Sequence, residues 1–259
     1  MAHLRVDFHS EVLRLSTSMT VILPQATTQQ IGMTGATRDG DPPVLWLLHG
    51  LSDDDTIWVR RTSIERYVAP LGLAVIMPQV HRSFYADEVL GGAYWTFVSE
   101  ELPEIVHSFF RLSRAREDTF VAGLSMGGFG AVKLALHHPE RFAAAASLSG
   151  VLDLAGMDLT WLESPHAPGA FRGRVFGGDV EGTDDDLLHL LARADPKALP
   201  ALYAYAGTED GVHEGNVRFR EAAVRLGVDL TTDFGPGTHE WSYWDDKIQD
   251  VLAWLPLRR

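Results

Sequence analysis

Short apolar runs alternate along the chain with segments of helical periodicity. Mostly apolar runs predict strands buried on both faces at residues 44–48, 73–77, 119–122, 143–148, 202–206 and 230–234. Helices are predicted at residues 63–69, 97–112, 129–138, 217–226 and 248–255. Strands that alternate with helices predict an α/β fold, in which helices cover both faces of a mostly parallel central sheet.

Three segments depart from this alternation. Leu4–Phe8 and Val12–Leu23 predict two further extended strands, and the polar stretch 25–43 predicts a long hairpin loop after them. Residues 152–200 hold no clear strand and are rich in glycine, proline and acidic residues. We interpret them as a lid-like insertion or pocket wall over the strand ends, the alternative being a disordered surface loop. The chain, residues 1–259, is then expected to form a single domain.

Charge and composition exclude several classes of binding partner and of chemistry. The formal net charge is −13, from 35 acidic and 22 basic residues, which argues against nucleic acid and anionic membrane surfaces. The chain has no cysteine, so disulfides and thiol chemistry are excluded. It has neither a secretory signal at its start nor a run approaching the ~18 apolar residues of a membrane helix. We therefore expect a cytoplasmic protein that does not bind membranes.

The glycine-rich stretch between a predicted strand and a predicted helix is the first candidate for chemistry. It reads Gly123-Leu124-Ser125-Met126-Gly127, a G-x-S-x-G pattern. A serine at a sharp strand-to-helix turn presents its hydroxyl above the sheet, and the helix N-terminus behind it favours a developing negative charge. We predict Ser125 as a nucleophile; the alternative is a tight glycine turn with a bystander serine.

A serine nucleophile needs a base to take its proton and an acid to hold that base. Two acids, Glu209 and Asp210, follow the predicted strand 202–206. His239 lies in a glycine-rich loop after the last predicted strand and is the expected base, with His213 as its rival. The chain thus offers a serine, an acid and a histidine in the order found in one large class of hydrolases.

Stabilisation of an oxyanion needs two backbone N–H donors. Met126 directly follows the predicted nucleophile, and Leu51 follows the predicted strand 44–48. We therefore expect the backbone N–H groups of these two residues to be the oxyanion donors. His49 is expected to brace this loop. The nearby acidic run 53–55 is interpreted as a solvated loop without a role, the alternative being repulsion of carboxylate substrates.

Fragments spread over nearly the whole chain resemble a known family. They read SEVLRLSTSMTVILP, LLHGLSDDDTIWVRRTSIERY, VIMPQV, EELPEIV, GLSMGGFGAVKLAL, AAASLSG, AGTEDG and GTHEWSYWD. The chain resembles the esterase D-like α/β-hydrolases, and among them the bacterial tributyrin esterases. The same family includes formylglutathione hydrolases, feruloyl and acetylxylan esterases, and mycolyltransferases.

The resemblance implies an α/β-hydrolase fold with two N-terminal antiparallel strands. It implies Ser125 as nucleophile, Asp210 rather than Glu209 as acid, His239 as base, and oxyanion donors at Leu51 and Met126. A serine esterase mechanism needs no metal and no organic cofactor, so we expect neither, and the resemblance makes a homo-oligomer plausible.

The expected function is that of a serine carboxylesterase acting on small-molecule esters with short acyl chains. The alternatives are an acyltransferase with the same triad, a deacetylase or feruloyl-type esterase acting on acylated sugars, and a non-catalytic binding protein. Five aromatic residues are candidates to line the substrate pocket: Trp58, Tyr94, Trp95, Trp161 and Trp241. Because aromatic side chains more often belong to a core, we expect only some of these to contact substrate.

Overall fold

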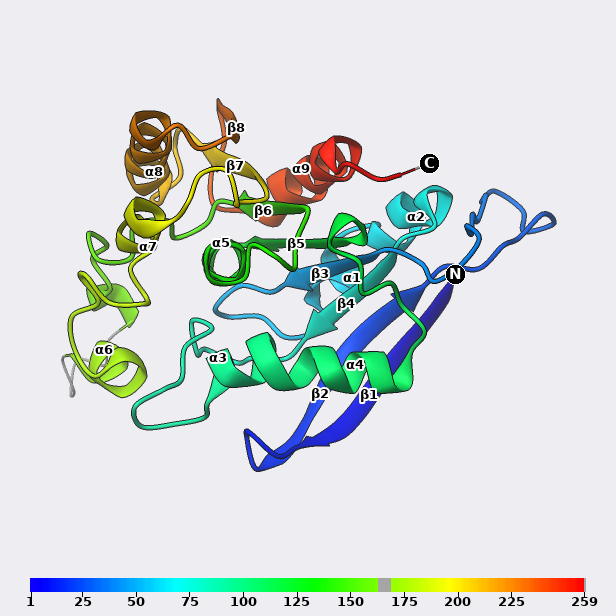
Figure 1. Ribbon diagram of the computed structural model, residues 1–259, viewed down its shortest axis with the longest axis horizontal. Helices are drawn as coiled ribbons and strands as arrows, with labels where there is room; N and C mark the ends of the chain where they lie inside the picture. The colour runs from blue at the N-terminus through cyan, green and yellow to red at the C-terminus, as the bar shows by residue number, and fades with distance from the viewer. Residues whose placement is uncertain (163–168, 259) are drawn as a thin grey trace.

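The computed structural model describes residues 1–162 and 169–258, and within them eight strands form one mixed sheet (Figure 1). The strands are β1 Ala2–Ser10, β2 Leu15–Leu23, β3 Val44–Leu48, β4 Ala74–Pro78, β5 Thr119–Leu124, β6 Ala144–Leu148, β7 Ala201–Gly207 and β8 Leu230–Gly235. Each strand predicted from the sequence is present, with shifts of a few residues at its ends.

The sheet runs in the order β1-β2-β4-β3-β5-β6-β7-β8. β1 pairs with β2, and β2 with β4, in antiparallel fashion, whereas the six strands β3 to β8 are parallel to one another. The predicted mostly parallel sheet with antiparallel N-terminal strands is therefore confirmed. Because six strands run in the same direction, the loops that follow them meet at one edge of the sheet.

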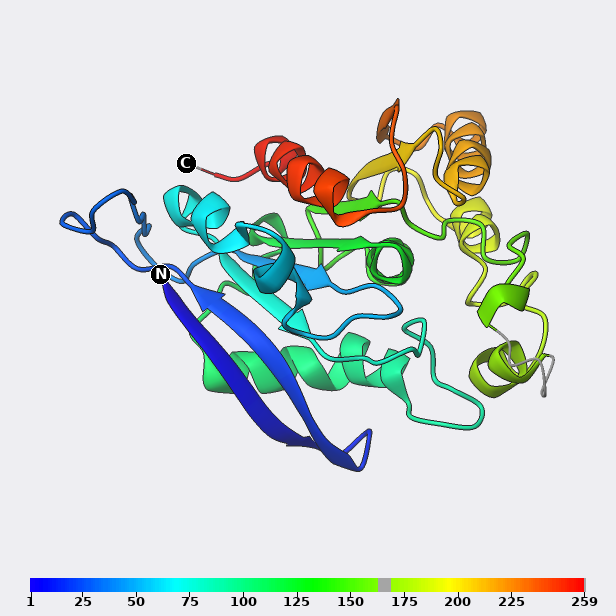
Figure 2. The ribbon, with the colours of Figure 1, turned by 180° about the vertical axis from the view of Figure 1, so that it is seen from behind.

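Helices cover both faces of the sheet. They are α1 Ile57–Arg61, α2 Ile64–Val68, α3 Tyr94–Thr96, α4 Leu102–Phe109, α5 Met126–His137, α6 Ala170–Phe176, α7 Leu187–Arg193, α8 His213–Leu226 and α9 Trp241–Trp254. Short 3₁₀ turns lie at Ala69–Leu71, Arg116–Asp118 and Thr160–Leu162, and a π-helical turn at Phe97–Glu101 joins α3 to α4. Figures 1 and 2 show α4 on one side of the sheet, and α2 and α9 on the other.

The alternation of side chains along β3 shows how one short strand builds two cores. Val44, Trp46 and Leu48 point into the core shared with α4, α5 and α8. Leu45 and Leu47 point into the core shared with α1, α2 and α9. A strand buried on both faces needs apolar residues at every position, and this is why its sequence reads as a continuous apolar run.

Several helices begin earlier than their sequence pattern indicates. The predicted helix 248–255 belongs to α9, which begins at Trp241, and the predicted helix 217–226 belongs to α8, which begins at His213. The described part of segment 152–200 holds α6 and α7; α7 contacts α5 and α8, and α6 lies on the same side of the molecule, at the left of Figure 1. In the described ranges, no helix is both long and apolar enough to cross a bilayer.

Candidate active site

Ser125 lies at the sharp turn between β5 and α5. Its backbone has φ 53° and ψ −120°, a conformation that is strained for a residue with a side chain. The Ser125 N–H donates to the Leu148 carbonyl at 2.9 Å, and the Ser125 carbonyl accepts from the Phe129 N–H at 3.1 Å. These bonds to β6 and α5 hold the strained turn in place, so the hydroxyl has a fixed position.

The glycines around Ser125 are required by close approach of backbones. A Cβ atom at Gly123 would lie 2.3 Å from the Gly127 carbonyl oxygen, and one at Gly127 would lie 2.4 Å from the Leu48 carbonyl oxygen. No real Cβ atom tolerates such distances from backbone. The glycines therefore let α5 begin directly against β3 and β5, as the sequence pattern predicted.

His239 and Asp210 lie in line with Ser125. The Nε2 atom of His239 is 3.0 Å from Ser125 Oγ, and its Nδ1 atom is 3.0 and 2.9 Å from the two carboxylate oxygens of Asp210. Because a carboxylate only accepts hydrogen bonds, Nδ1 carries the proton of the neutral ring, and the lone pair of Nε2 faces the serine hydroxyl. This arrangement can draw the proton from Ser125.

The two rival residues are engaged elsewhere. A carboxylate oxygen of Glu209 accepts from the Gly237 N–H at 2.7 Å and so fixes the loop that carries His239. The His213 ring packs edge-on against Phe234, with centroids 5.5 Å apart. Of the two acids after β7, the structure thus brings Asp210 to the imidazole and leaves Glu209 as a loop brace.

Asp210 is buried, at 6 % exposed, yet the balance of its surroundings favours the charged form. Burial acts to raise the pKa of this carboxyl group. The hydrogen bonds and positive charge of His239, the Val212 N–H and the Ser149 hydroxyl outweigh burial, so the pKa lies below its ordinary value. Asp210 is therefore ionised at neutral pH and can stabilise an imidazolium at His239.

The two expected oxyanion donors follow β3 and β5. Met126 is the first residue of α5, and Leu51 lines the same cavity as Ser125. The loop before Leu51 is held by His49: its Nδ1 lies 2.7 Å from the Gly50 carbonyl oxygen and its Nε2 accepts from the Val80 N–H at 3.1 Å. Burial lowers the pKa of His49, so this neutral ring acts as a brace.

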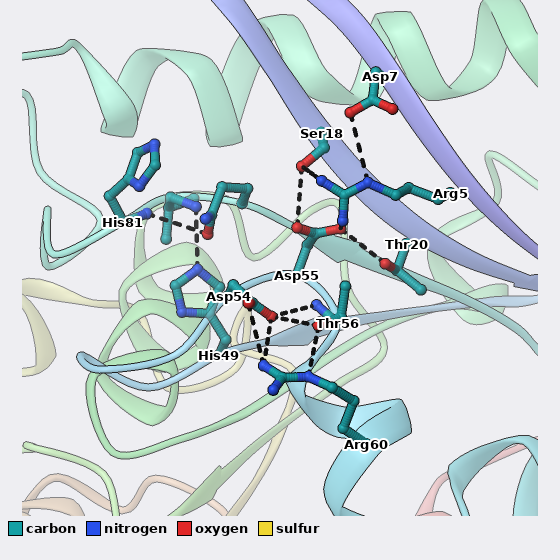
Figure 3. Close-up of polar contacts among 12 residues, drawn as sticks. Arg5, Asp7, Ser18, Thr20, His49, Asp54, Asp55, Thr56, Arg60 and His81 are labelled. Atoms are coloured by element: carbon teal, nitrogen blue, oxygen red, sulfur yellow. Dashed lines mark hydrogen bonds and ion pairs between the residues drawn. The ribbon is translucent and has the colours of Figure 1, made fainter.

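The acidic run 53–55 is not a solvated loop (Figure 3). Asp55, at 2 % exposed, accepts hydrogen bonds from Ser18 Oγ at 3.0 Å and Thr20 Oγ1 at 2.8 Å, and pairs with Arg5. Asp54 accepts from Thr56 and pairs with Arg60 on α1. The expectation of a loop without a role is therefore wrong, because two of the three carboxylates tie the Leu51 loop to the sheet and to α1.

A cavity of about 450 Å³ opens beside Ser125 and His239. Its apolar lining comes from Leu51, Phe84, Val151, Leu152, Met157 and Val212. Besides Asp210, its charged lining comes from Asp153, Asp158 and Glu214, with Arg218, which pairs with Asp153. Residues within 152–158, at the start of the segment 152–200 interpreted as an insertion, thus contribute one wall of the cavity. The sequence reading missed Phe84 and the charged residues, since nothing in their local pattern distinguishes them from core and surface positions.

Of the proposed pocket tryptophans, the three whose side chains are described, Trp58, Trp95 and Trp241, are not among the residues that line this cavity. Trp58 is fully buried, donates to the Leu48 carbonyl at 3.1 Å and packs edge-on against Trp241. The Trp95 ring packs against the Lys133 ammonium, 4.3 Å from its centroid. These three indoles support the loops and α5 from within. The Trp161 side chain lies outside the described residues.

Tyr94 lines a second cavity of about 400 Å³, which shares Leu51 with the first. Over residues 1–162 and 169–258, no group of three or more potential ligand side chains is arranged to hold a metal ion.

Comparison with known proteins identifies the family. The family model described as "Putative esterase" matches residues 10–255. The chain is 27% identical to an acetyl esterase of Caldicellulosiruptor saccharolyticus over 98% of both chains. It is 35% identical to two Staphylococcus aureus structures that cover 98% of both chains, the fluorophosphonate-binding serine hydrolase FphF (TM-score 0.84) and the S-formylglutathione hydrolase FrmB (TM-score 0.82).

The chain belongs to this esterase family, has the α/β-hydrolase fold and is a carboxylic ester hydrolase. The fold and family relations implied by the sequence fragments are confirmed.

Proposed function

We propose that this member of the esterase family hydrolyses short-chain acyl esters through an acyl-enzyme formed on Ser125. The observation that carries the proposal is the unbroken line of contacts from Ser125 through His239 to Asp210, at 2.9 to 3.0 Å. Similarity to a fluorophosphonate-binding serine hydrolase supports a serine nucleophile, and similarity to an acetyl esterase supports a small acyl group.

The first half-reaction transfers the acyl group to the enzyme. His239 Nε2 takes the proton of Ser125 as its Oγ attacks the ester carbonyl, and Asp210 stabilises the imidazolium that forms. The backbone N–H groups of Leu51 and Met126 hold the oxyanion. Loss of one such donor typically costs about 10² to 10³ in turnover. His239 then gives its proton to the departing alcohol.

The second half-reaction uses water. His239 takes a proton from a water molecule, which attacks the acyl carbonyl, and returns it to Ser125 as the acid leaves. The His239 side chain is 38% exposed, so water reaches the base easily. This exposure favours hydrolysis over acyl transfer to a second alcohol, for which water must be kept out.

The cavity supports a small substrate that is neutral or cationic. Its volume of about 450 Å³ lies toward the lower end for ligand sites. Asp153, Asp158 and Glu214 bring three carboxylates, and Arg218, itself paired with Asp153, is the single guanidinium among the lining residues described. A carboxylate on the substrate would therefore meet net repulsion there.

Hydrolysis of p-nitrophenyl acetate, butyrate and octanoate tests the proposal. We expect rates that fall with acyl length and are lost in Ser125→Ala, while Ser108→Ala, which changes an exposed serine on α4, keeps wild-type rates. Product analysis with a competing alcohol separates hydrolysis from transfer. Absence of ester hydrolysis by the wild type, or activity that survives in Ser125→Ala, would overturn the proposal.

A further inference from the structure

Tyr85 lies in the loop after β4 and takes no direct part in the proposed reaction. We infer that it is a positioning residue for the oxyanion hole: its hydroxyl holds the His49 carbonyl beside the Leu51 loop, and Lys133 of α5 holds Tyr85 in place. The inference rests on the proposed function, because it concerns the expected donor at Leu51. Its experiment is chosen so that the two can fail separately.

The loop that carries Tyr85 has a strained backbone. Tyr85 has φ 50°, and His81 and Phe84 before it have φ 50° and 52°. Three of the five residues 81–85 thus adopt the left-handed region, although none of them is glycine. Such conformations persist only where the surrounding contacts over-determine them. The contacts that fix Tyr85 come from two sides, its hydroxyl and its backbone carbonyl.

The Tyr85 hydroxyl reaches the loop that carries an expected oxyanion donor. Tyr85 is fully buried, and its hydroxyl donates to the His49 carbonyl at 3.0 Å. Because a carbonyl oxygen only accepts, the phenolic proton is committed to this bond. Burial raises the pKa of this hydroxyl well above its ordinary value, so the proton is kept at neutral and mildly alkaline pH.

The His49 carbonyl lies one peptide group before the group that carries the Leu51 N–H. That second group consists of the Gly50 carbonyl and the Leu51 N–H, and its carbonyl lies 2.7 Å from His49 Nδ1, which must be the donor. His49 Nε2 in turn accepts from the Val80 N–H at 3.1 Å. The imidazole therefore sets the plane of the donor group, and the Tyr85 hydroxyl fixes the backbone from which the imidazole extends.

Lys133 on α5 holds Tyr85 at its backbone. The Lys133 side chain is 3% exposed, and its ammonium donates to the Tyr85 carbonyl at 2.9 Å and to Asp185 Oδ1 at 2.5 Å. The ammonium also lies 4.3 Å from the centroid of the Trp95 ring. A buried ammonium needs such partners to offset the loss of hydration. Because Lys133 lies about two helical turns after Met126, it ties Tyr85 to the helix that provides the other expected donor.

The Tyr85 ring also packs directly against that helix. A Cβ atom at Gly130 would lie 2.5 Å from the Tyr85 ring, closer than real Cβ atoms come to their neighbours. Glycine at this position therefore lets the ring lie against α5. Tyr85 thus joins α5, which begins with Met126, to the loop that carries Leu51, and it fixes the separation of the two expected oxyanion donors.

Tyr85→Phe removes the hydroxyl and keeps the ring. We expect kcat for p-nitrophenyl acetate to fall about tenfold, less than for outright loss of a donor. KM should stay nearly unchanged, because both half-reactions pass through an oxyanion and slow together. Tyr203→Phe is the matched control: Tyr203 is 5% exposed, and its hydroxyl donates to Asp233 on β8 at 3.3 Å. This control should keep kcat within about twofold.

A tetrahedral adduct separates positioning from a general loss of structure. A short alkyl trifluoromethyl ketone adds to the Ser125 hydroxyl and places a negatively charged oxygen in the oxyanion hole. For Tyr85→Phe we expect the inhibition constant to rise by the same factor as kcat/KM falls. Partial unfolding would instead reduce the amount of active enzyme, which lowers kcat and leaves the inhibition constant unchanged.

Lys133→Met removes the ammonium and keeps a long side chain. We expect a smaller loss of kcat, and little further loss when it is combined with Tyr85→Phe, since both changes act through the His49 carbonyl. Full additivity of the two losses would contradict the part assigned to Lys133. Thermal unfolding checks that each variant is folded.

The outcomes distinguish the inference from the function on which it rests. Wild-type kcat and a wild-type inhibition constant in folded Tyr85→Phe would overturn the inference and leave the triad intact. Activity that survives in Ser125→Ala would instead overturn the proposed function.

Discussion

Two buried carboxylates lie at opposite ends of two parallel strands, β5 and β7, which β6 separates in the sheet. Asp210 follows the carboxyl end of β7, and Asp118 precedes the amino end of β5. Both are less than a tenth exposed. Burial acts to raise the pKa of Asp118, but hydrogen bonds from Arg38, Arg258 and Ser113 outweigh it and lower the pKa to about 2. The pKa of Asp210 is also lowered.

The difference between the two acids lies in their partners. Asp118 faces guanidinium groups at 2.6 and 2.8 Å, which keep their charge at every physiological pH, so the pair is static. Asp210 faces His239, an imidazole whose charge changes within the proposed catalytic cycle. Burial and a lowered pKa are therefore common to both sites, and a partner that can gain and lose a proton separates the proposed catalytic site from the structural one.

The largest effect is expected from Asp210→Asn. The amide cannot hold the imidazole in the correct tautomer or stabilise its charge, so kcat should fall by about 10³ to 10⁴. The measurement is p-nitrophenyl acetate turnover, with thermal unfolding to confirm the fold. Asp118→Asn is the matched control and should retain turnover within about twofold. If Asp210→Asn keeps turnover within tenfold of wild type, the proposed catalytic role of Asp210 is contradicted.

The Asp118→Asn variant also tests the contribution of Asp118 to the stability of the fold. Asp118→Asn leaves Arg38 and Arg258 without their shared carboxylate, and we expect the free energy of unfolding to fall by about 1 to 2 kcal/mol. The figure is moderate because the Arg258 side chain is 55% exposed and can be hydrated. Urea unfolding measures it. An unchanged midpoint would mean that this cluster contributes nothing to the fold.

The pH dependence of that stability has a defined sign. Because the folded pKa of Asp118, about 2, lies below its ordinary 3.8, its contribution is complete above about pH 4 and is lost as pH falls toward 2. The difference in free energy of unfolding between wild type and Asp118→Asn should therefore be largest at neutral pH. It should shrink by about 1 kcal/mol as the pH falls toward 2. A difference that grows toward acid would contradict the assignment.

Much of the architecture follows from the sequence because its signals are local. The run Val44–Leu48 must be buried on both sides, and the glycines around Ser125 have no other reason to cluster. The family fragments then place an acid and a histidine at the same edge as this serine. The starts of α8 and α9 were missed, because polar and aromatic residues such as Trp241 and Ser242 interrupt the helical pattern there.

The features that the sequence does not predict depend on distant contacts. Asp55 is an anchor only because hydroxyls on β2 face it, and Trp58 is a structural residue only because the Leu48 carbonyl lies within its reach. Ser149 follows an apolar run much as Ser125 does, but its hydroxyl is fixed by a hydrogen bond from Trp244, 95 residues away in the chain. Such pairings become visible only when the sheet brings the loops together.

The smallest effect is expected at the cavity wall. Glu214→Gln removes one negative charge, so kcat/KM for an ester that carries a carboxylate should rise about two- to fivefold, with no change for p-nitrophenyl acetate. Glu221→Gln removes a charge from the same helix away from the cavity and serves as control. Equal effects of the two variants would show that the gain comes from net charge alone.

Covalent labelling tests the central claim most directly. Wild type and Ser125→Ala are treated with an alkyl fluorophosphonate and digested, and the modified peptide is identified by mass spectrometry. The account predicts one adduct in the wild type, on Ser125, its rate of formation reduced in Asp210→Asn, and none in Ser125→Ala. An adduct on another residue, or labelling that persists in Ser125→Ala, would show that the strained serine at the end of β5 is not the nucleophile.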